Sequence, residues 1–484
     1  MSDKSKKTHC ILPYMHLYAE PTGLVKPCCI GGEFEDKLSL RDLSVEEAIN
    51  SPQMKQLRKD MSEGIRNSVC MVCYEREDRG ETSPRENFNK NTLWKMPKVG
   101  KDFSVPKDAL QHIDIRFSNL CNFKCRMCNH TFSSEWYKEI PLVENPHDDE
   151  IRTKEYYDYW KQNNPKKVIK AKEGIVEELK PFLPSVKSWY FAGGEPLITP
   201  EHSELLNYLH KTKPTIDIWG RQKKDVSIHY NTNLSILRFE KYNFLDIWFD
   251  FNKVFLSISC DGIGEIGEYQ RTGFKTDVFI KNLKEIKKYF QPANSETQEV
   301  GYGYNFQYTT TIYNVFHIWD FYKFMLDEGY IEHERNIDFY YAWAPRRSAL
   351  KYLPEADKPR VVEYLTDLLT KFKEPTTINK IESMIAFTKE QPDEHFLRYE
   401  RDQLIKENAR LDELRGGKQM KDINGMDWMK TYKAPIGSPI WKKQQELKGF
   451  KNFGDKKDND GNPIYKPPIG SDGWKDEKDE KKLF

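Results

Sequence analysis

Three cysteines lie within eight residues of one another in the stretch FSNLCNFKCRMCNHTF, at Cys121, Cys125 and Cys128. Thiolates are soft ligands that select zinc, copper(I) or iron–sulfur clusters, so this C-x3-C-x2-C spacing predicts a metal centre. A structural site normally closes with four protein ligands, whereas an open position implies chemistry. Either His130 completes a Cys3His zinc site, or the thiolates hold a cubane cluster whose fourth iron lacks a protein ligand. We favour the cubane cluster.

A second group of polar residues follows later predicted strands. In YFAGGEPLITPEH, Gly193 and Gly194 allow close backbone approach to a ligand, and the carboxylate of Glu195 lies beside them. A tight strand–helix turn is the alternative interpretation of the same residues. Further on, Asn231 and Asn233 in HYNTNLS are candidates for hydrogen bonds to hydroxyl groups, with an Asn-rich turn as the alternative.

Five more cysteines precede residue 75. Four of them, Cys10, Cys28, Cys70 and Cys73, supply enough thiolates for a complete iron–sulfur cluster or a zinc ion. Cys29 is an alternative to Cys28 as the ligand. An iron–sulfur cluster, structural zinc and free thiols all remain open for this part of the chain.

The elements that must position these residues follow an alternating pattern. Helical patterns separate several of six β-rich runs, which lie at 112–117, 186–192, 226–231, 253–260, 304–312 and 336–343. In TPEHSELLNYLHK, Thr199 is an N-cap candidate and Pro200 the first helical residue. A second amphipathic helix is predicted for TDVFIKNLKEIKKYF. Strands that alternate with helices predict a parallel α/β sheet, either open or closed into a full or partial barrel.

The composition of the chain limits which classes of protein it can belong to. The chain has 484 residues, a formal net charge of +1 and 38% hydrophobic residues, which suffices for a sizeable core. The charge balance argues against bulk electrostatic capture of nucleic acid or of an anionic membrane. We find no spanning apolar run and no signal peptide, and we therefore expect a cytoplasmic protein, with no nucleic acid or membrane partner.

The same patterns suggest five segments. We predict a cysteine-rich module at 1–90, a Lys-, Pro- and Gly-containing linker at 91–108, a catalytic core at 109–350 and a charged helical extension at 351–432. Residues 433–484 lose apolar periodicity and are rich in Gly, Pro, Lys and Asp, so we expect disorder there.

The cysteine motif directly after a first strand resembles the signature of the radical SAM enzymes. The resemblance implies a partial (βα)6 TIM-like barrel in which Cys121, Cys125 and Cys128 hold a [4Fe–4S] cluster. In that family the unligated iron binds the amino and carboxylate groups of S-adenosylmethionine, whose reductive cleavage yields a 5′-deoxyadenosyl radical that removes hydrogen from the substrate. The cofactor thus carries the difficult chemistry and the protein orients it.

The resemblance also assigns cofactor-binding roles to other residues. The turn at Gly193, Gly194, Glu195 and Pro196 resembles the family's GGEP motif, which holds the amino group of the cofactor's methionine. Asn231 and Asn233 would then face the ribose. LSISCDGIGEIGEYQRTG resembles the family's S-x-D-G followed by arginine, so Ser259, Asp261 and Arg271 are candidates, with Arg271 pairing with the cofactor carboxylate.

The early cysteines resemble half of a SPASM auxiliary-cluster domain, the version called a twitch domain. The spacing C-x12-G-x4-C runs from Cys10 through Gly23 to Cys28, and C-x2-C follows at Cys70 and Cys73. In the family this domain usually follows the barrel, whereas here the cysteines precede it. The resemblance implies a second iron–sulfur cluster that binds substrate or relays an electron during its oxidation.

The resulting hypothesis is a radical SAM enzyme, an oxidoreductase or a peptide- or small-molecule-modifying enzyme. A peptide is the preferred substrate, because relatives with such modules modify peptides, and a small carbohydrate-like alcohol is the alternative. An external reductant such as flavodoxin or ferredoxin would supply electrons. The rival hypothesis is a zinc-stabilised, non-enzymatic binding or scaffold protein in which both cysteine groups are structural.

Overall fold

The computed structural model describes most of the chain. Described residues are 7–78, 80, 82–90, 95–139, 168–212, 215–216, 222–293, 301–391, 408–409, 411–412, 415–416 and 422–423. They form two compact units: the first takes in the described residues up to 309 together with 317–340, and the second takes in 310–316 and the described residues from 341 onward. The tail predicted to be disordered, 433–484, lies outside the described residues. The predicted segment boundaries at 90, 108 and 350 stay a prediction.

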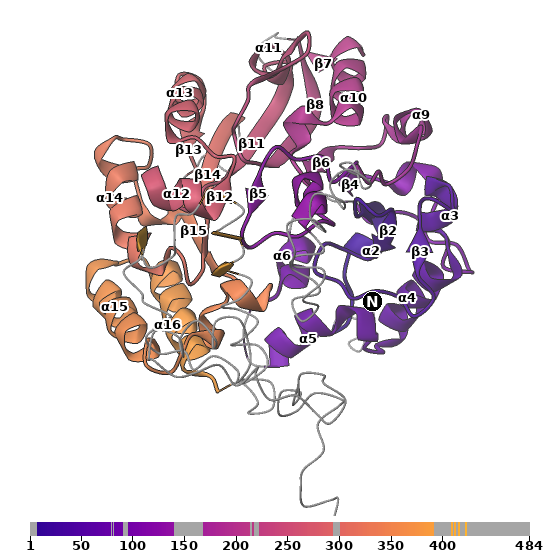
Figure 1. Ribbon diagram of the computed structural model, residues 1–484. Coiled ribbons are helices and arrows are strands. Elements are labelled where there is room, and N and C mark those ends of the chain that lie inside the picture. Colours follow the sequence, from indigo (N-terminus) through magenta and orange to yellow (C-terminus); the bar gives the residue numbers. More distant parts are fainter. Residues whose placement is uncertain are drawn as a thin grey trace, which may run out of the picture. The chain divides into compact units, whose positions relative to one another are not determined.

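The first unit is built on one mixed sheet of 11 strands (Figure 1). Its main path runs β13-β14-β11-β8-β6-β4-β1-β2-β3, with β15 on β14 and β7 on β8. The strands are β1 (His16–Ala19), β2 (Leu24–Lys26), β3 (Leu38–Ser39), β4 (His112–Ile115), β6 (Ser188–Phe191), β7 (Thr215–Ile216), β8 (Gln222–Thr232), β11 (Phe251–Ser259), β13 (Gln291–Pro292), β14 (Gly301–Thr310) and β15 (Ile337–Tyr341).

The core of this sheet is parallel. Strands β4, β6, β8, β11 and β14 pair in parallel, each with its neighbour on the path, and β15 pairs with β14. These six strands coincide with the six β-rich runs of the sequence. Parallel pairing requires crossover connections, and described helices lie between several of the strands. The predicted α/β fold, a partial TIM-like barrel, is confirmed.

An additional parallel strand, β1, joins the sheet ahead of the predicted first strand. His16 pairs with His112 and Tyr18 with Asp114, and β2 and β3 continue antiparallel beyond β1. The sequence analysis treated residues 1–90 only as a cysteine-rich module and missed these strands. Each has at most four residues, which is too short for a period-2 pattern to be recognised.

The sheet has an apolar face and a polar face. Ile113, Trp189, Ile228 and Val254 lie side by side in register and are 0–1% exposed. Since side chains alternate along a strand, the neighbouring register row lies on the other face. That row contains Tyr18, Asp114, Tyr190, His229 and Phe255. The polar face therefore carries titratable groups inside the fold.

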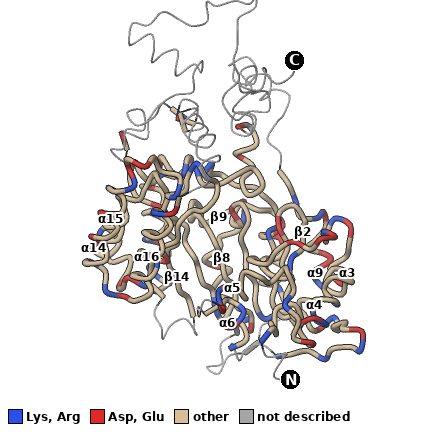
Figure 2. The backbone as a smooth tube through the Cα atoms, turned by 90° about the horizontal axis from the view of Figure 1, so that it is seen from below, with Lys and Arg blue, Asp and Glu red and all other residues tan. Residues whose placement is uncertain are grey.

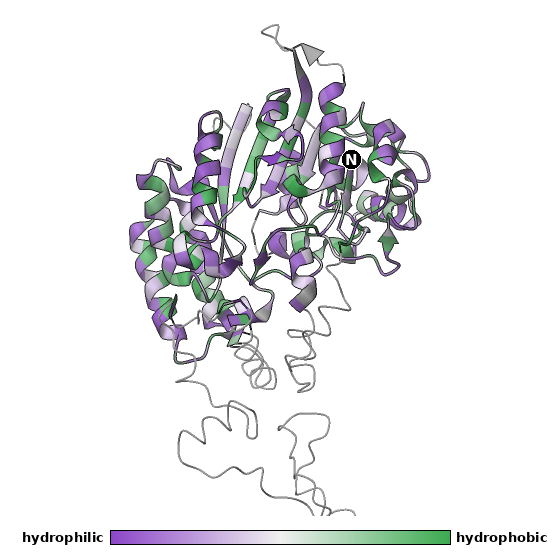
Figure 3. Cartoon of the chain, turned by 45° about the horizontal axis from the view of Figure 1, so that its top comes forward, coloured by the Kyte–Doolittle hydropathy of each residue, from purple (hydrophilic) through white to green (hydrophobic). Residues whose placement is uncertain are grey.

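Helices follow the strands, and several line the outer side of the sheet in Figure 1. In the first unit they are α2 (Leu12–Met15), α3 (Val45–Ile49), α4 (Pro52–Glu63), α5 (Met71–Asp78), α6 (Pro84–Lys90), α9 (Ile175–Leu179), α10 (Pro200–Lys211), α11 (Phe244–Trp248), α12 (Gly264–Gln270), α13 (Thr276–Lys287) and α14 (Ile318–Asp327). Both predicted helices form, as α10 and α13. Figure 3 shows hydrophobic and hydrophilic residues alternating along the helices, as expected where one face covers a core.

The second unit contains α15 (Lys358–Lys371) and α16 (Pro375–Lys389). Val361, Leu365 and Leu368 of α15 are buried at helical spacing, as are Ile381 and Met384 of α16. Both helices lie inside the segment 351–432, whose description as one helical extension stays a prediction. Figure 2 shows Lys and Arg interleaved with Asp and Glu along the described chain. None of the described helices is both long and apolar enough to cross a membrane.

Candidate functional site

The cysteine motif occupies the loop that follows β4. Cys125 ends β5 (Lys124–Cys125), which pairs antiparallel with β12 (Arg271–Thr272), and the backbone N–H of Cys128 donates to the Cys125 carbonyl at 2.9 Å. Cys121 is buried. Burial raises its pKa well above the ordinary thiol value, and the thiols of Cys125 and Cys128 raise it further. The three sulfur atoms therefore share one electrostatic neighbourhood.

Contacts from several elements hold this loop. Trp136 donates from Nε1 to the Cys125 carbonyl at 3.0 Å, and the Cys121 N–H donates to Ser134 Oγ at 3.3 Å. Arg126 lies over the ring of Tyr269, with 3.7 Å between the guanidinium carbon and the ring centroid. Arg126 Nε also donates to the Tyr269 carbonyl at 3.1 Å. The backbone that carries the three cysteines is thus fixed at several points.

The two glycines after β6 pack against the start of the cysteine loop. A Cβ atom on Gly194 would lie 2.1 Å from the Leu120 carbonyl oxygen, and one on Gly193, whose φ is +124°, would lie 2.9 Å from that of Ser118. The backbone N–H groups of Gly194 and Glu195 donate to the carbonyls of Ser118 and Leu120, at 3.2 and 2.8 Å respectively. Only glycines permit so close a contact, so the turn positions the cysteine loop.

Glu195 is buried, and its carboxylate is occupied by the chain itself. Oε1 accepts from Thr232 Oγ1 at 2.8 Å and from the Leu197 N–H at 3.1 Å, while Oε2 accepts from the Asn233 N–H at 2.7 Å. Burial raises the pKa of Glu195 to about 7, and these hydrogen bonds oppose the rise. In this structure the acid joins the turn after β6 to the end of β8.

Asp261 and Arg271 form a buried ion pair near the cysteines. Arg271 Nε donates to Asp261 Oδ2 at 2.6 Å, and Asp261 Oδ1 accepts from the Thr309 N–H at 2.8 Å. Arg271 Nη1 lies 3.8 Å from Cys125 Sγ. Burial opposes the charge of Arg271, but Asp261 and then Cys125 outweigh it and raise the pKa of the guanidinium. Asp261 and Arg271, two of the predicted site residues, thus contact each other beside Cys125.

The remaining predicted residues lie at the carboxyl ends of the strands. Asn231 is half-buried opposite Ser257, and Ser259 is half-buried opposite Gln307. Asn233 donates from Nδ2 to Asn122 Oδ1 of the cysteine loop at 3.0 Å. Pro196 begins a short 3-10 turn, Pro196–Ile198, and is buried. Strand ends of a parallel sheet meet at one edge, which is where ligands bind in such folds.

Four of the early cysteines gather in the first unit. Burial raises the pKa of Cys10, and the thiols of Cys28, Cys70 and Cys73 add to the rise. Burial, with a smaller contribution from Cys73, raises the pKa values of Cys28 and Cys70 to about 12. These four thiols are neighbours although they come from distant parts of the sequence.

Cys29 faces a different environment from its neighbour Cys28. Cys29 is exposed, but surrounding atoms limit its hydration and raise its pKa. The carboxylate of Asp114 on β4 adds to this rise, and the guanidinium of Arg116 opposes it. The dipeptide therefore presents one thiol to the other early cysteines and one to the polar face of the sheet.

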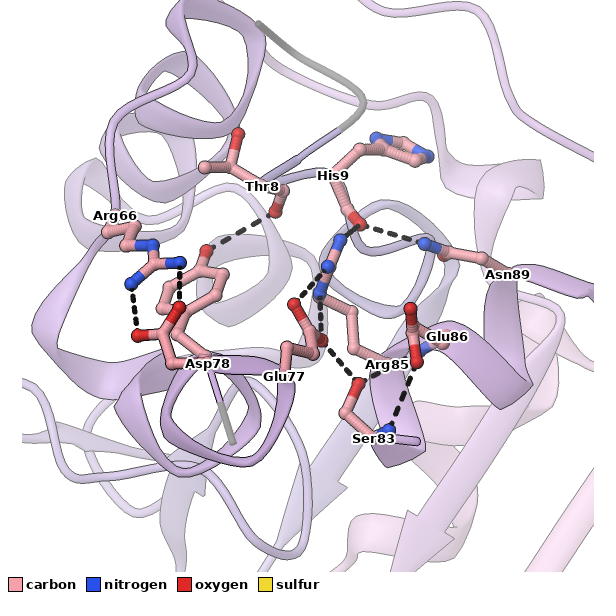
Figure 4. Close-up of polar contacts among 10 residues, drawn as sticks. Thr8, His9, Arg66, Glu77, Asp78, Ser83, Arg85, Glu86 and Asn89 are labelled. Carbon is pink, nitrogen blue, oxygen red and sulfur yellow. Dashed lines mark hydrogen bonds and ion pairs between the residues drawn. The ribbon is translucent and has the colours of Figure 1, made fainter. Parts of the chain in front are cut away.

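A polar network supports the early cysteines (Figure 4). Arg85 donates from Nε to Glu77 Oε1 at 3.0 Å and from Nη1 to the His9 carbonyl at 2.6 Å, which fixes the backbone beside Cys10. The Tyr74 hydroxyl donates to the Thr8 carbonyl at 3.3 Å. This network anchors the chain just before Cys10 to the helices α5 and α6.

The donor sets suit soft metal centres. Each contains thiols that influence one another's pKa, and thiolates are the ligands of iron–sulfur clusters and of zinc. Across the described residues, no three or more His, Cys, Asp or Glu side chains are already arranged around a position where a metal ion could sit. The match between each cysteine set and a metal centre therefore depends on the thiol ligands and on their electrostatic influence on one another.

Asp114 and Arg116 were missed by the sequence analysis. They lie on and directly after β4, close to Cys29, at an ion-pair distance of 3.8 Å between Arg116 Nε and Asp114 Oδ1. A signal for them is present in HIDIRF, where polar residues occupy every second position of the strand.

Comparison with known proteins places a family domain over this site. Residues 115–308 match the family model described as the radical SAM superfamily. The matched segment runs from the end of β4 into β14 and contains the three clustered cysteines, Gly193–Glu195 and Arg271. No curated protein matches the chain.

Three of the solved structures that resemble the chain illustrate the range of similarity. Polyhistidine-tagged anSMEcpe with bound AdoMet is 16% identical, covers 54% of this chain and 58% of that chain, and has a TM-score of 0.33. Streptococcus suis SuiB bound to S-adenosylmethionine is 14% identical, with 73% and 67% covered and a TM-score of 0.28. TYW1 with a lysine-pyruvate adduct is 13% identical, with 51% and 70% covered and a TM-score of 0.23. The chain thus spans 58% of the first of these proteins.

Proposed function

Because residues 115–308 match the model of the radical SAM superfamily, a family of enzymes, we propose that the chain cleaves S-adenosylmethionine reductively and removes hydrogen from a substrate. Cys121, Cys125 and Cys128 would hold a [4Fe–4S] cluster, which would supply the reducing electron when bound, while the surrounding residues would orient the cofactor and the substrate. The observation that carries the proposal is the clustering of Cys121, Cys125 and Cys128 inside the matched segment, beside a buried arginine.

The chain's own residues have distinct roles in this proposal. The three thiolates hold the cluster, and the closely packed glycines at 193–194 keep their loop in place. The Gly193–Pro196 turn, with Asn231, Asn233 and Ser259, would receive the cofactor at the strand ends. Asp261 orients Arg271, whose guanidinium has donors on more than one side for a carboxylate. Arg271 would then contact both the cofactor and Cys125.

The early cysteines form a second centre in this proposal. Cys10, Cys28, Cys70 and Cys73 would ligate an auxiliary iron–sulfur cluster of the twitch or SPASM kind, placed before the barrel. Their mutual effect on the thiol pKa values supports a shared site. The cluster would bind the substrate or accept an electron from it.

The proposal extends to the substrate, the reductant and the cellular compartment. We expect a peptide, with a small molecule as the alternative, and a flavodoxin- or ferredoxin-like reductant. A reducing compartment such as the cytoplasm suits free thiols that await iron–sulfur assembly.

Anaerobic purification tests the central proposal. A brown protein with roughly eight irons per chain would fit two cubane clusters. With dithionite and S-adenosylmethionine it should release 5′-deoxyadenosine, and Cys125→Ala should abolish that release, while Cys70→Ala should retain some of it. Asp225→Asn is the control, because it changes an exposed acid that pairs with Lys187 at 2.9 Å. A colourless, zinc-containing protein, or a Cys125→Ala variant that is as active as the parent, would overturn the proposal.

A further inference from the structure

A group of residues on the polar face of the sheet, which we take as the inner face because helices line the other, lies between the two cysteine sets. Tyr18 of β1, Asp114 of β4 and Tyr190 of β6 are register partners and therefore point to the same face. Arg116 follows two residues after Asp114 on that face, and the charges of both act on the thiol of Cys29. We call these five residues the inner-face patch.

The charged pair in this patch is incompletely satisfied. Asp114 is 4% exposed, and its Oδ1 atom is buried without a hydrogen-bond partner, as is Arg116 Nε. The two atoms lie 3.8 Å apart, which is too long for a hydrogen bond. Burial raises the pKa of Asp114 to about 6, although Arg116 opposes the rise. Buried charged groups normally have their hydrogen bonds completed, so the pair has unused capacity for a ligand.

Aromatic rings hold the guanidinium in position. The Arg116 guanidinium lies 5.1 Å from the centroid of the Tyr18 ring and 6.0 Å from that of Phe132. The charges of Asp114 and Arg116 act on the pKa of the Tyr190 hydroxyl. Tyr340 of β15, which is 42% exposed, also acts on this pKa. The patch thus combines one acid and one base with rings that limit their movement.

The patch borders the turn proposed to hold the cofactor. A Cβ atom on Gly193 would lie 3.2 Å from Cβ of Arg116, so the Gly193 backbone packs closely against Arg116. On its other side the patch reaches Cys29, whose chain neighbour Cys28 belongs to the early cysteine set. A group bound here would lie between the two proposed metal centres.

We propose that the inner-face patch is the substrate-recognition site of this chain and that it takes an aminoacyl unit. Asp114 would accept from the N–H or ammonium group of that unit, and Arg116 would donate to its carbonyl or carboxylate oxygen. Every aminoacyl unit has a nitrogen donor close to an oxygen acceptor, in a peptide and in a free amino acid alike. A carboxylate beside a guanidinium can bind both groups at once. The proposal rests on the function proposed above and names its substrate class.

The exposed Cys29 thiol provides a readout that does not require turnover. A ligand in the patch should slow the alkylation of Cys29 by iodoacetamide in the anaerobic holoenzyme, followed by peptide mass spectrometry. The probes are N-acetyl amino acid N-methylamides, the corresponding free amino acids and sorbitol. We expect at least one amide or amino acid probe to protect Cys29, and sorbitol to have no effect. Protection by the amides alone indicates a peptide substrate, and protection by the free amino acids alone indicates a free one.

Variants connect the protection to the charged pair. Asp114→Asn keeps the shape but loses a charge-assisted hydrogen bond, so the protecting probe should be needed at about tenfold higher concentration. Arg116→Met should have a similar effect and Arg116→Lys a smaller one, because lysine keeps the charge without the planar fork. Tyr190→Phe, which removes only a hydroxyl, provides a milder variant if the others fold poorly.

Matched controls separate recognition from structure. Asp225→Asn changes an exposed acid that pairs with Lys187 at 2.9 Å, and it should leave the protection unchanged. The proposal is overturned if no amide or amino acid protects Cys29, if sorbitol alone protects it, or if Asp114→Asn lowers thermal stability without altering protection. A protein whose Cys29 is protected by these probes but that releases no 5′-deoxyadenosine would contradict the proposed function and leave this site standing.

Discussion

Arg271 lies directly opposite Cys125 in the short antiparallel pair of β12 and β5, with its Nη1 atom 3.8 Å from the cysteine sulfur. The same guanidinium is bonded to Asp261, which in turn accepts from the backbone of Thr309 on β14. A continuous set of contacts therefore runs from the fifth predicted strand to the cysteine loop. A cation held beside a thiolate ligand stabilises the negative charge of a metal–thiolate centre.

Arg271→Lys should reduce the release of 5′-deoxyadenosine by at least about tenfold, since a single ammonium cannot match the fork that reaches both Asp261 and Cys125. The iron content should stay at the parent level, because all cysteines remain. Quantifying 5′-deoxyadenosine and iron in the same preparation checks this. Lys275→Ala is the control, as it removes an exposed lysine just after β12 that lies 3.4 Å from Glu268. Parent-level cleavage by Arg271→Lys would contradict the role given to the arginine.

Gly194→Ala should displace the cysteine loop, because the new methyl group would lie 2.1 Å from the Leu120 carbonyl oxygen. We expect lower iron retention and a stability loss of about 2 kcal/mol or more, as for overpacked sites. Iron analysis and thermal unfolding measure the two effects. Gly32→Ala is a matched control with an ordinary nearest contact of 3.4 Å. Equal iron content in both variants would show that the turn does not hold the loop.

The paired cysteines at 28 and 29 should differ in their effect on metal content. Cys28→Ser should lose most of the auxiliary iron, because Cys28 neighbours Cys70 and Cys73, whereas Cys29→Ser should retain it, because Cys29 lies by Asp114. Iron and sulfide analysis of anaerobic preparations of the Cys28→Ser and Cys29→Ser variants measures this difference. The reverse result would make Cys29 the ligand.

Stability should depend on pH through Asp114. Burial raises its pKa from the ordinary value of 3.8 to about 6 in the folded chain, so between these values the folded state binds more protons here than the unfolded state. The contribution of this group to stability therefore falls as pH rises from about 4 to 6. Asp114→Asn removes this dependence, and relative to the variant the parent should lose up to roughly 3 kcal/mol across that range, at about 1.4 kcal/mol per pKa unit.

Unfolding experiments on both proteins at a series of pH values test this difference. Asp225→Asn, at an exposed site, should follow the parent. A constant difference between the parent and Asp114→Asn at all pH values would show that burial does not raise the pKa of Asp114.

Much of the fold could be predicted because its elements carry local signals. The runs around Trp189 and Val254 are apolar and long enough to be recognised as strands, and Pro200 marks the start of α10. The pairing of β1 with β4 could not be predicted, because four residues carry no clear period and their partner lies about a hundred residues away in the sequence. The close contact between Gly194 and Leu120 likewise could not be predicted. The two glycines indicated only that some group approaches their backbone closely.

By itself, the sequence determined which residues can bind soft metals and the alternation of strands and helices, since both depend on residue type and short spacing. Only the tertiary structure decided that Cys28 and Cys29 face different surroundings and that Arg271 meets Cys125. It alone also brought Asp114 and Arg116 together with Cys29. These relationships depend on strand register between distant segments, and register follows from burial across the whole sheet rather than from any local stretch.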